Sequence, residues 1–197
     1  MGWGPDLCAK AAVPTYPCLI DERHIVAELY NMTNVPMAVW IDEQGHLVRP
    51  VEPTGAGDGF RTMDRATFTM KPEVAAQGRS ARQSYIDALR DWVNNGAASR
   101  YALSAEQLLA RIEAPSSDEA TANANFRLGQ YLFAQGHNAA AQRYFDSAKG
   151  LCPESWHFVR QALEMVGVGN ASGAEFFAAV DALGDRPYYP PVAFEGK

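Results

Sequence analysis

The chain has 197 residues, of which 47% are hydrophobic and 20% charged, and its formal net charge is −6. These values indicate a globular protein of one large or two small domains with a sizeable core, and they exclude a disordered chain. The acidic balance argues against nonspecific binding to nucleic acid or to an anionic membrane surface. No apolar run approaches the length of a membrane span.

The N-terminus reads MGWGPDLCAKAAVP and lacks a basic start followed by an apolar core, so we expect no signal peptide. Three cysteines, an odd number, favour reduced thiols and a cytoplasmic location.

The first elements are short. Residues 6–12 are typical of a helix end and residues 18–20 of a strand. Asp21 can cap a helix over residues 24–30, because its carboxylate can accept from exposed amide groups. The apolar residues of this helix fall on one side: Ile25, Val26, Leu29 and Tyr30.

A β-hairpin follows. Residues 37–41 form a continuous apolar run, MAVWI, which is typical of a strand covered on both faces. The turn DEQG spans residues 42–45, and residues 46–49 return as the partner strand.

Residues 11–51 resemble the C-terminal half of a thioredoxin fold, through the order strand, helix, Val35-Pro36, strand, Asp42-x-x-Gly45, strand. The resemblance implies a cis peptide bond before Pro36 and an extended peptide paired with the backbone of Val35. The Cys-x-x-Cys motif that carries the family's redox chemistry is absent, and so is the early βαβ portion of the fold. The missing strand would leave unpaired edges, so we expect a homo-oligomer that associates through them.

Cys8 and Cys18 lie ten positions apart and are weak candidates for a disulfide or a redox pair. A pair of small buried hydrophobic residues is the favoured interpretation.

Residues 50–65 are rich in proline and glycine and predict a long irregular connection. The spacing of Gly55, Gly57 and Gly59 is compatible with a phosphate cradle. A linker is favoured, because Pro53 precedes the glycines and no Lys-Ser/Thr follows them.

Residues 72–94 predict a helix that ends near Gly96. Its arginines, Arg79, Arg82 and Arg90, are more typical of a solvated face than of an anion site. Ser104 opens a capping box for a short helix that extends to Ile112.

Residues 122–155 resemble one tetratricopeptide repeat, through Leu128, Gly129, Gly136, Ala141, Phe145, Ala148 and Pro153. Gly129 and Ala141 are small where two antiparallel helices would cross closely, and Phe145 would fill the groove between them. The resemblance implies a concave face that binds a protein or peptide through Asn123, Phe126, Gln130 and Phe133. The alternative is that the two phenylalanines are core residues, which is favoured for at least one of them.

Two more helices are expected, over residues 153–166 and 174–183. The buried side of the first would carry Trp156, Val159, Leu163 and Val166. The tail from residue 185 cannot be helical, because its prolines remove amide donors, so it would lie extended over an apolar surface.

The expected fold class is therefore α/β followed by all-α. It comprises a partial thioredoxin-like domain (1–52), a connection (53–70), a helical domain (71–184) and an extended tail (185–197). The favoured function is a noncatalytic protein-interaction module. The alternative is a thiol-disulfide oxidoreductase that uses Cys8 or Cys18. We expect no cofactor and no metal site, since the histidines His24, His46, His137 and His157 are scattered.

Overall fold

The computed structural model describes residues 15–112, 114–192 and 194. A two-stranded antiparallel sheet precedes a series of helices, so the α/β part followed by a helical part is confirmed. The expected helix end at residues 6–12 and Cys8 lie outside the described residues. The elements are α2 (Ile25–Leu29), β1 (Met37–Ile41), β2 (Leu47–Pro53), η1 (Asp58–Thr62), α3 (Pro72–Asn95), η2 (Gly96–Ala98), α4 (Ala105–Leu109), α5 (Ser117–Ala134), α6 (Asn138–Leu151), α7 (Trp156–Val166), η3 (Asn170–Ser172) and α8 (Ala174–Asp181).

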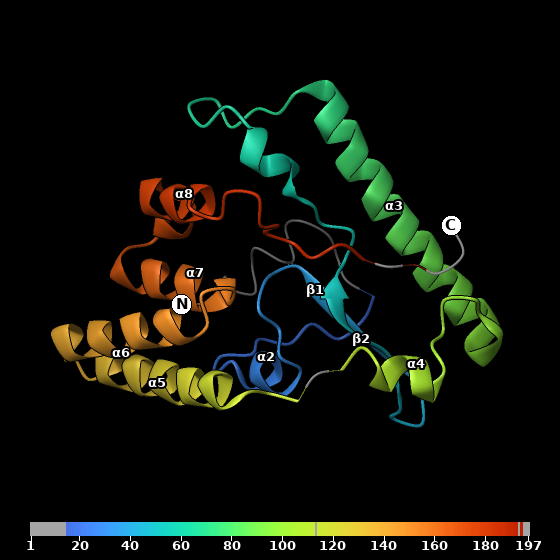
Figure 1. The fold of residues 1–197 in the computed structure, drawn as a ribbon, viewed down its shortest axis with the longest axis horizontal. Coiled ribbons are helices and arrows are strands. Elements are labelled where there is room, and N and C mark those ends of the chain that lie inside the picture. The colour runs from blue at the N-terminus through green and yellow to red at the C-terminus, as the bar shows by residue number, and fades with distance from the viewer. Residues whose placement is uncertain (1–14, 113, 193, 195–197) are drawn as a thin grey trace.

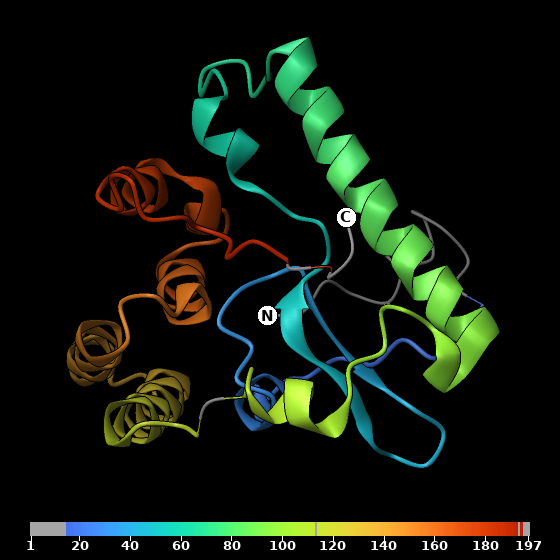
Figure 2. The same cartoon turned by 45° about the vertical axis from the view of Figure 1, so that its right-hand side comes forward.

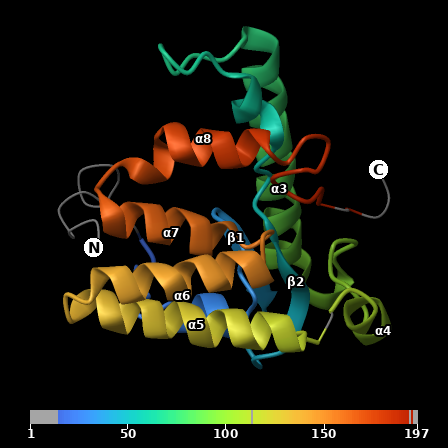
Figure 3. The same cartoon turned by 60° about the vertical axis from the view of Figure 1, so that its left-hand side comes forward.

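The hairpin lies between two helical parts. The long helix α3 runs along one side, and α5 to α8 stand on the other side (Figures 1 and 2). Figure 3 shows these four helices stacked in chain order. None of the described helices is both long enough and apolar enough to span a bilayer.

Three clusters of buried side chains hold these parts together. The first fills the space among α5, α6 and α7, the second joins α7 and α8 to the C-terminal segment, and the third lies between the hairpin and α3. In the third cluster the indole of Trp40 donates a hydrogen bond of 2.8 Å to the hydroxyl of Tyr85. The long helix α3 therefore packs on the hairpin through buried aromatic residues.

The hairpin forms as expected, and the Val35–Pro36 peptide bond is cis. The expected strand at residues 18–20 is wrong, because no strand forms in this segment and Leu19 is 92% exposed. Full cover of β1 is also wrong: within this strand only Trp40 is buried, and Ile41 is 37% exposed. The sheet described here has two strands, so no third strand shields the apolar side chains of β1.

Asp21 caps α2 as expected, with its carboxylate accepting from the amides of Ile25, Val26 and Ala27. The helix has five residues, and none of them is buried. Its apolar side is therefore left largely in solvent, as the 76% exposure of Leu29 illustrates.

The expected connection is more ordered than its composition suggests, since β2 extends to Pro53 and η1 follows. Gly55 has φ +72°, and a Cβ there would lie 2.7 Å from the carbonyl oxygen of Ala81. A Cβ on Gly59 would lie 2.7 Å from a methyl group of Val74. These glycines let the segment approach α3 closely. Close packing therefore accounts for Gly55 and Gly59 without a phosphate, whereas nothing lies within 4 Å of a Cβ on Gly57.

The helices α5 and α6 form the close pair that the sequence predicts. A Cβ on Gly129 would lie 2.6 Å from the ring of Phe145, which is itself 1% exposed. Ala141 and Ala148 are fully buried in the same cluster. The third helix starts at Trp156, three residues later than expected, and Val166 is 67% exposed, so its expected burial is wrong. Val166 is the last residue of α7, where Gly167 ends the helix and little packs against it.

Replacing Gly129 with alanine should lower the free energy of unfolding by about 1–3 kcal/mol, because the new methyl group overpacks the ring of Phe145. Urea unfolding followed by circular dichroism measures the loss. The matched control is Gly150→Ala in α6, where nothing lies within 4 Å of the new Cβ. The control should be neutral or slightly stabilising. Equal losses in the two variants would contradict the close crossing.

Candidate functional site

The C-terminal strap, residues 185–192, runs from the end of α8 back toward the hairpin (Figures 1 and 2). Tyr188 is buried in the second cluster, where its ring centroid lies 4.4 Å from Trp156 and 4.9 Å from Phe60. Phe194, just beyond the strap, packs on Tyr85 in the third cluster. As the prolines predict, no helix forms among the described residues of this tail, which packs on apolar clusters through Tyr188 and Phe194.

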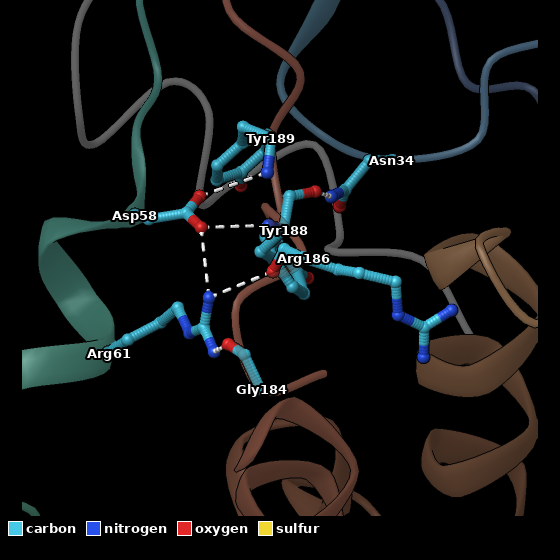
Figure 4. Close-up of polar contacts among 7 residues, drawn as sticks. All are labelled: Asn34, Asp58, Arg61, Gly184, Arg186, Tyr188 and Tyr189. Atoms are coloured by element: carbon cyan, nitrogen blue, oxygen red, sulfur yellow. Dashed lines mark hydrogen bonds and ion pairs between the residues drawn. The ribbon is translucent and has the colours of Figure 1, made fainter. Parts of the chain in front are cut away.

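Asp58 holds the backbone of the strap (Figure 4). Its carboxylate accepts hydrogen bonds from the amide of Tyr188 at 2.8 Å and from that of Tyr189 at 2.9 Å. The guanidinium of Arg61, one turn along η1, also contacts this carboxylate at 3.3 Å. A carboxylate that accepts amide and guanidinium hydrogen bonds makes contacts stronger than those between neutral groups.

Arg61 and Asn34 add three further contacts to the backbone of the strap and of Gly184, just before it (Figure 4). Arg61 donates to the carbonyl oxygens of Gly184 at 2.6 Å and Arg186 at 3.0 Å. The side-chain amide of Asn34, which is buried, donates to the carbonyl oxygen of Tyr188 at 3.2 Å. The strap is thus fixed from η1 on one side and from the segment before β1 on the other.

The backbone of Val35, the expected site of peptide pairing, is already bonded within the chain. Its amide donates to Oδ1 of Asn34 at 2.9 Å, and its carbonyl oxygen accepts from the hydroxyl of Tyr189. Burial, followed by the neighbouring Tyr188, raises the pKa of Tyr189 to about 12, so this hydroxyl keeps its proton. An incoming strand would have to displace both contacts to pair with Val35.

A cleft of about 640 Å³ opens beside Pro36, between the glycine-rich segment and the first half of α3. We call it the Pro36 cleft. Its volume lies in the range of ligand-binding pockets. It is lined by Pro36, Thr54, Gly55, Ala56, Gly57, Asp58, Gly59, Phe60, Met70, Val74, Ala75, Gln77, Gly78, Arg79, Ala81, Arg82 and Tyr189.

Of the four residues expected on the concave face, one is buried and three are half-buried. Phe126 is 2% exposed within the first cluster, and Phe133 packs against the same cluster. Asn123 and Gln130 are half-buried. Phe126 is therefore a core residue, the alternative that was favoured for at least one of the two phenylalanines, because its ring packs against Phe145 and Phe158.

Residues 24–33 of the same chain lie against this side of α5. The ring of His24 lies 6.0 Å from that of Phe126, and Asn31 donates to the carboxylate of Glu119 at 3.0 Å. Glu28 forms an ion pair with Arg127. The α/β part therefore contacts part of the face on which the repeat was expected to bind a partner.

His157, on α7, also contacts residues 24–33. Its amide donates to the carbonyl oxygen of Thr33 at 3.0 Å, and its Nδ1 lies 2.9 Å from Oγ of Ser155. Its ring stacks on that of His24 at 6.3 Å. Burial, and then the proximity of His24, lower the pKa of His157 to about 4. Burial also lowers the pKa of His24.

The free energy of unfolding should fall as the pH is lowered from about 6.5 to about 4, because unfolded His157 binds a proton in this window and folded His157 does not. The loss of unfolding free energy from this one group approaches about 3 kcal/mol at the acidic end of the window, and there is no loss above pH 6.5. Carboxylates titrate in part of the same range, so urea unfolding of wild type and His157→Asn is compared at each pH. The variant should show the shallower dependence, and parallel curves would contradict the assignment.

The cysteines differ in environment. Cys18 is exposed, whereas Cys152 is buried in the first cluster, where burial and then the charge of Glu154 raise the pKa of its thiol to about 11. The exposure of Cys18 contradicts its expected burial, and follows from the absence of a strand at residues 18–20. Among the described residues no group of three or more histidine, cysteine or carboxylate side chains converges as a metal site would require.

Sequence reasoning missed the residues that build this site, among them Asn34, Asp58 and Tyr189. Their contacts span 130 to 154 positions of the chain, and no local pattern records such distances. Comparisons with protein-family models, with curated proteins and with solved structures find no match for this chain.

Proposed function

We propose that this chain is a noncatalytic protein-interaction module that binds an extended peptide segment in the Pro36 cleft. The single observation that supports this proposal is the cleft itself, whose volume of about 640 Å³ would take the side chains of a short segment. Apolar and polar groups share its walls, as is usual for a binding pocket. Of the residues expected to bind a partner, Pro36 lines the cleft, whereas the side of α5 that carries Phe126 is covered by the chain itself.

The test fills the cleft. Gly78 lines it from α3, and nothing lies within 4 Å of a Cβ placed there, so Gly78→Trp can fold while its indole takes up the space. Gly150→Trp in α6 is the matched control, with the same open surroundings away from the cleft. Peptides selected from a display library on the full chain are then measured against both variants by fluorescence anisotropy.

We expect Gly78→Trp to abolish binding of the selected peptides and Gly150→Trp to leave it unchanged. Peptides that bind both variants alike, or a library that yields no binder, would overturn the proposal.

A thiol-disulfide oxidoreductase is the second candidate, and the exposure of Cys18 is the observation in its favour. We expect iodoacetamide at neutral pH to modify Cys18 well before Cys152, because Cys152 is buried and the pKa of its thiol is raised to about 11. Mass spectrometry of tryptic peptides follows the reaction. If Cys152 reacted first, its buried position would be contradicted. An unusually fast reaction that is lost in Cys8→Ser or Cys18→Ser would favour the enzyme over the interaction module.

Self-association through an unpaired strand edge stays a prediction. The observation that favours it is a set of exposed apolar side chains before the hairpin in the chain, which includes Leu19, Ile20 and Leu29.

A further inference from the structure

The Pro36 cleft carries positive charge on one wall. Arg79 and Arg82 line it from α3, one helical turn apart, and both side chains are exposed. Neither forms an ion pair with any residue in the part of the chain that the structure describes. By contrast Arg90, farther along the same helix, pairs with Asp87 at 3.5 Å. The two arginines of the cleft are thus placed to receive a carboxylate from outside.

The acidic residue of the cleft cannot serve them as a partner. Asp58 also lines the cleft, but its carboxylate accepts from two strap amides and contacts Arg61. Its charge is therefore balanced at the strap. The positive charge of the opposite wall remains uncompensated, in a chain whose net charge is −6.

Part of the remaining wall is apolar. Val74 and Ala75 lie about one turn before Arg79 and two turns before Arg82 on α3. Met70 and Phe60 complete this part of the lining. Met70 is 43% exposed, so it can cover an incoming side chain. An apolar surface next to two guanidinium groups fits a segment in which an apolar side chain stands beside carboxylates.

We propose that the Pro36 cleft selects acidic peptide segments, with an apolar side chain against Val74 and Met70 and carboxylates on Arg79 and Arg82. This inference rests on the proposed function and adds the class of partner. Guanidinium groups bind carboxylates through paired hydrogen bonds, which gives both attraction and geometry. Opposite charge also raises the rate of encounter, so binding should weaken as salt is added.

The experiment uses the full chain and two short fluorescein-labelled peptides, one of alternating glutamate and leucine and one of alternating lysine and leucine. Fluorescence anisotropy measures their affinity for wild type, for the double variant Arg79→Gln, Arg82→Gln, and for its charge reversal Arg79→Glu, Arg82→Glu. The control Arg90→Gln removes a positive charge from the same helix outside the cleft. Circular dichroism verifies that each variant is folded.

We expect wild type to bind the glutamate peptide at least about tenfold more tightly than the lysine peptide. The glutamine double variant should bind the glutamate peptide about tenfold more weakly or worse, and the charge reversal more weakly still. Arg90→Gln should change the affinity for this peptide less than about twofold. If the charge-reversal variant misfolds, the inference is tested by the glutamine double variant and by the salt dependence of glutamate-peptide binding to wild type.

Equal binding of the two peptides to wild type, or equal losses in the glutamine double variant and in Arg90→Gln, would overturn this inference. If Gly78→Trp no longer binds the library-selected peptides but the glutamine double variant binds them normally, the proposed function stands and only the acidic preference falls. If Gly78→Trp has no effect on any peptide, the proposed function falls and the acidic preference with it.

Discussion

Replacing Arg49 with methionine is expected to lower the free energy of unfolding by about 3–5 kcal/mol. Arg49 is 1% exposed on β2, and its guanidinium makes two hydrogen bonds to the carboxylate of Glu52, at 2.8 and 2.9 Å. A third, of 2.9 Å, goes to the carbonyl oxygen of Tyr101. Methionine fills much of the same volume but leaves the carboxylate of Glu52, which is 8% exposed, without its cation. The cost arises from this uncompensated buried charge.

Urea unfolding followed by tryptophan fluorescence measures the effect, because Trp40 stacks beside Arg49 with its ring centroid 5.4 Å from the guanidinium carbon. The control is Arg90→Met, which breaks the exposed pair with Asp87 and should cost less than about 1 kcal/mol. The double variant Arg49→Met, Glu52→Leu should recover much of the loss, because it removes both charges. A loss below about 1 kcal/mol in Arg49→Met would show that Glu52 tolerates burial without the charge of Arg49.

Replacing Tyr188 with alanine is expected to cost about 3–5 kcal/mol. The ring is 3% exposed and packs among Phe60, Trp156 and Phe176. Its removal leaves a cavity at the point where the strap, η1 and the last two helices meet. We also expect the strap to become sensitive to protease, since the bonds from Asp58 and Asn34 would then act on a segment without its main apolar anchor.

The measurements are thermal unfolding and the rate of limited proteolysis in the strap. Tyr131→Ala is the control, because this tyrosine is 62% exposed on α5, and it should change the unfolding free energy by less than about 0.5 kcal/mol. Similar effects in the two variants would contradict the anchoring role of Tyr188. A large loss of stability without faster cleavage of the strap would show that Tyr188 supports α7 and α8 more than the strap.

The strap gives the Pro36 cleft part of its wall through Tyr189, while Asp58 belongs to both the cleft and the strap contacts. Loss of strap anchoring should therefore alter the cleft as well as stability. The proposed binding site and the C-terminal segment are structurally coupled, although more than 150 positions separate Val35 from Tyr189 in the chain.

Local signals were sufficient for much of the fold. Small residues and an aromatic ring at helical spacing predict the close pair α5 and α6, because the missing Cβ of Gly129 leaves room for the ring of Phe145. Both hydrogen bonds of the capping box form: the side chain of Ser104 accepts from the amide of Gln107, and the side chain of Gln107 accepts from the amide of Ser104. The motif could be predicted because it depends only on residues three positions apart. The hairpin follows from an apolar run, a turn and a second run.

Burial was predicted less well, because it depends on what lies opposite a residue. The apolar run at residues 18–20 resembles a strand, yet it finds no partner and stays in solvent. Phe126 sits at a position expected to face a partner, yet the helices around it enclose its ring. Arg49 stands in the expected partner strand of the hairpin, and its burial with Glu52 has no signal in the local sequence.

The sequence by itself determined where helices and turns form, where two helices can approach closely, and that Pro36 precedes a strand, since each depends on neighbouring residues and backbone preferences. Only the tertiary structure decided that the strap bonds to Asp58 and Val35, that residues 24–33 contact α5, and that Arg79 and Arg82 face a cleft. These features join residues far apart in the chain, and their positions depend on how all the elements pack together.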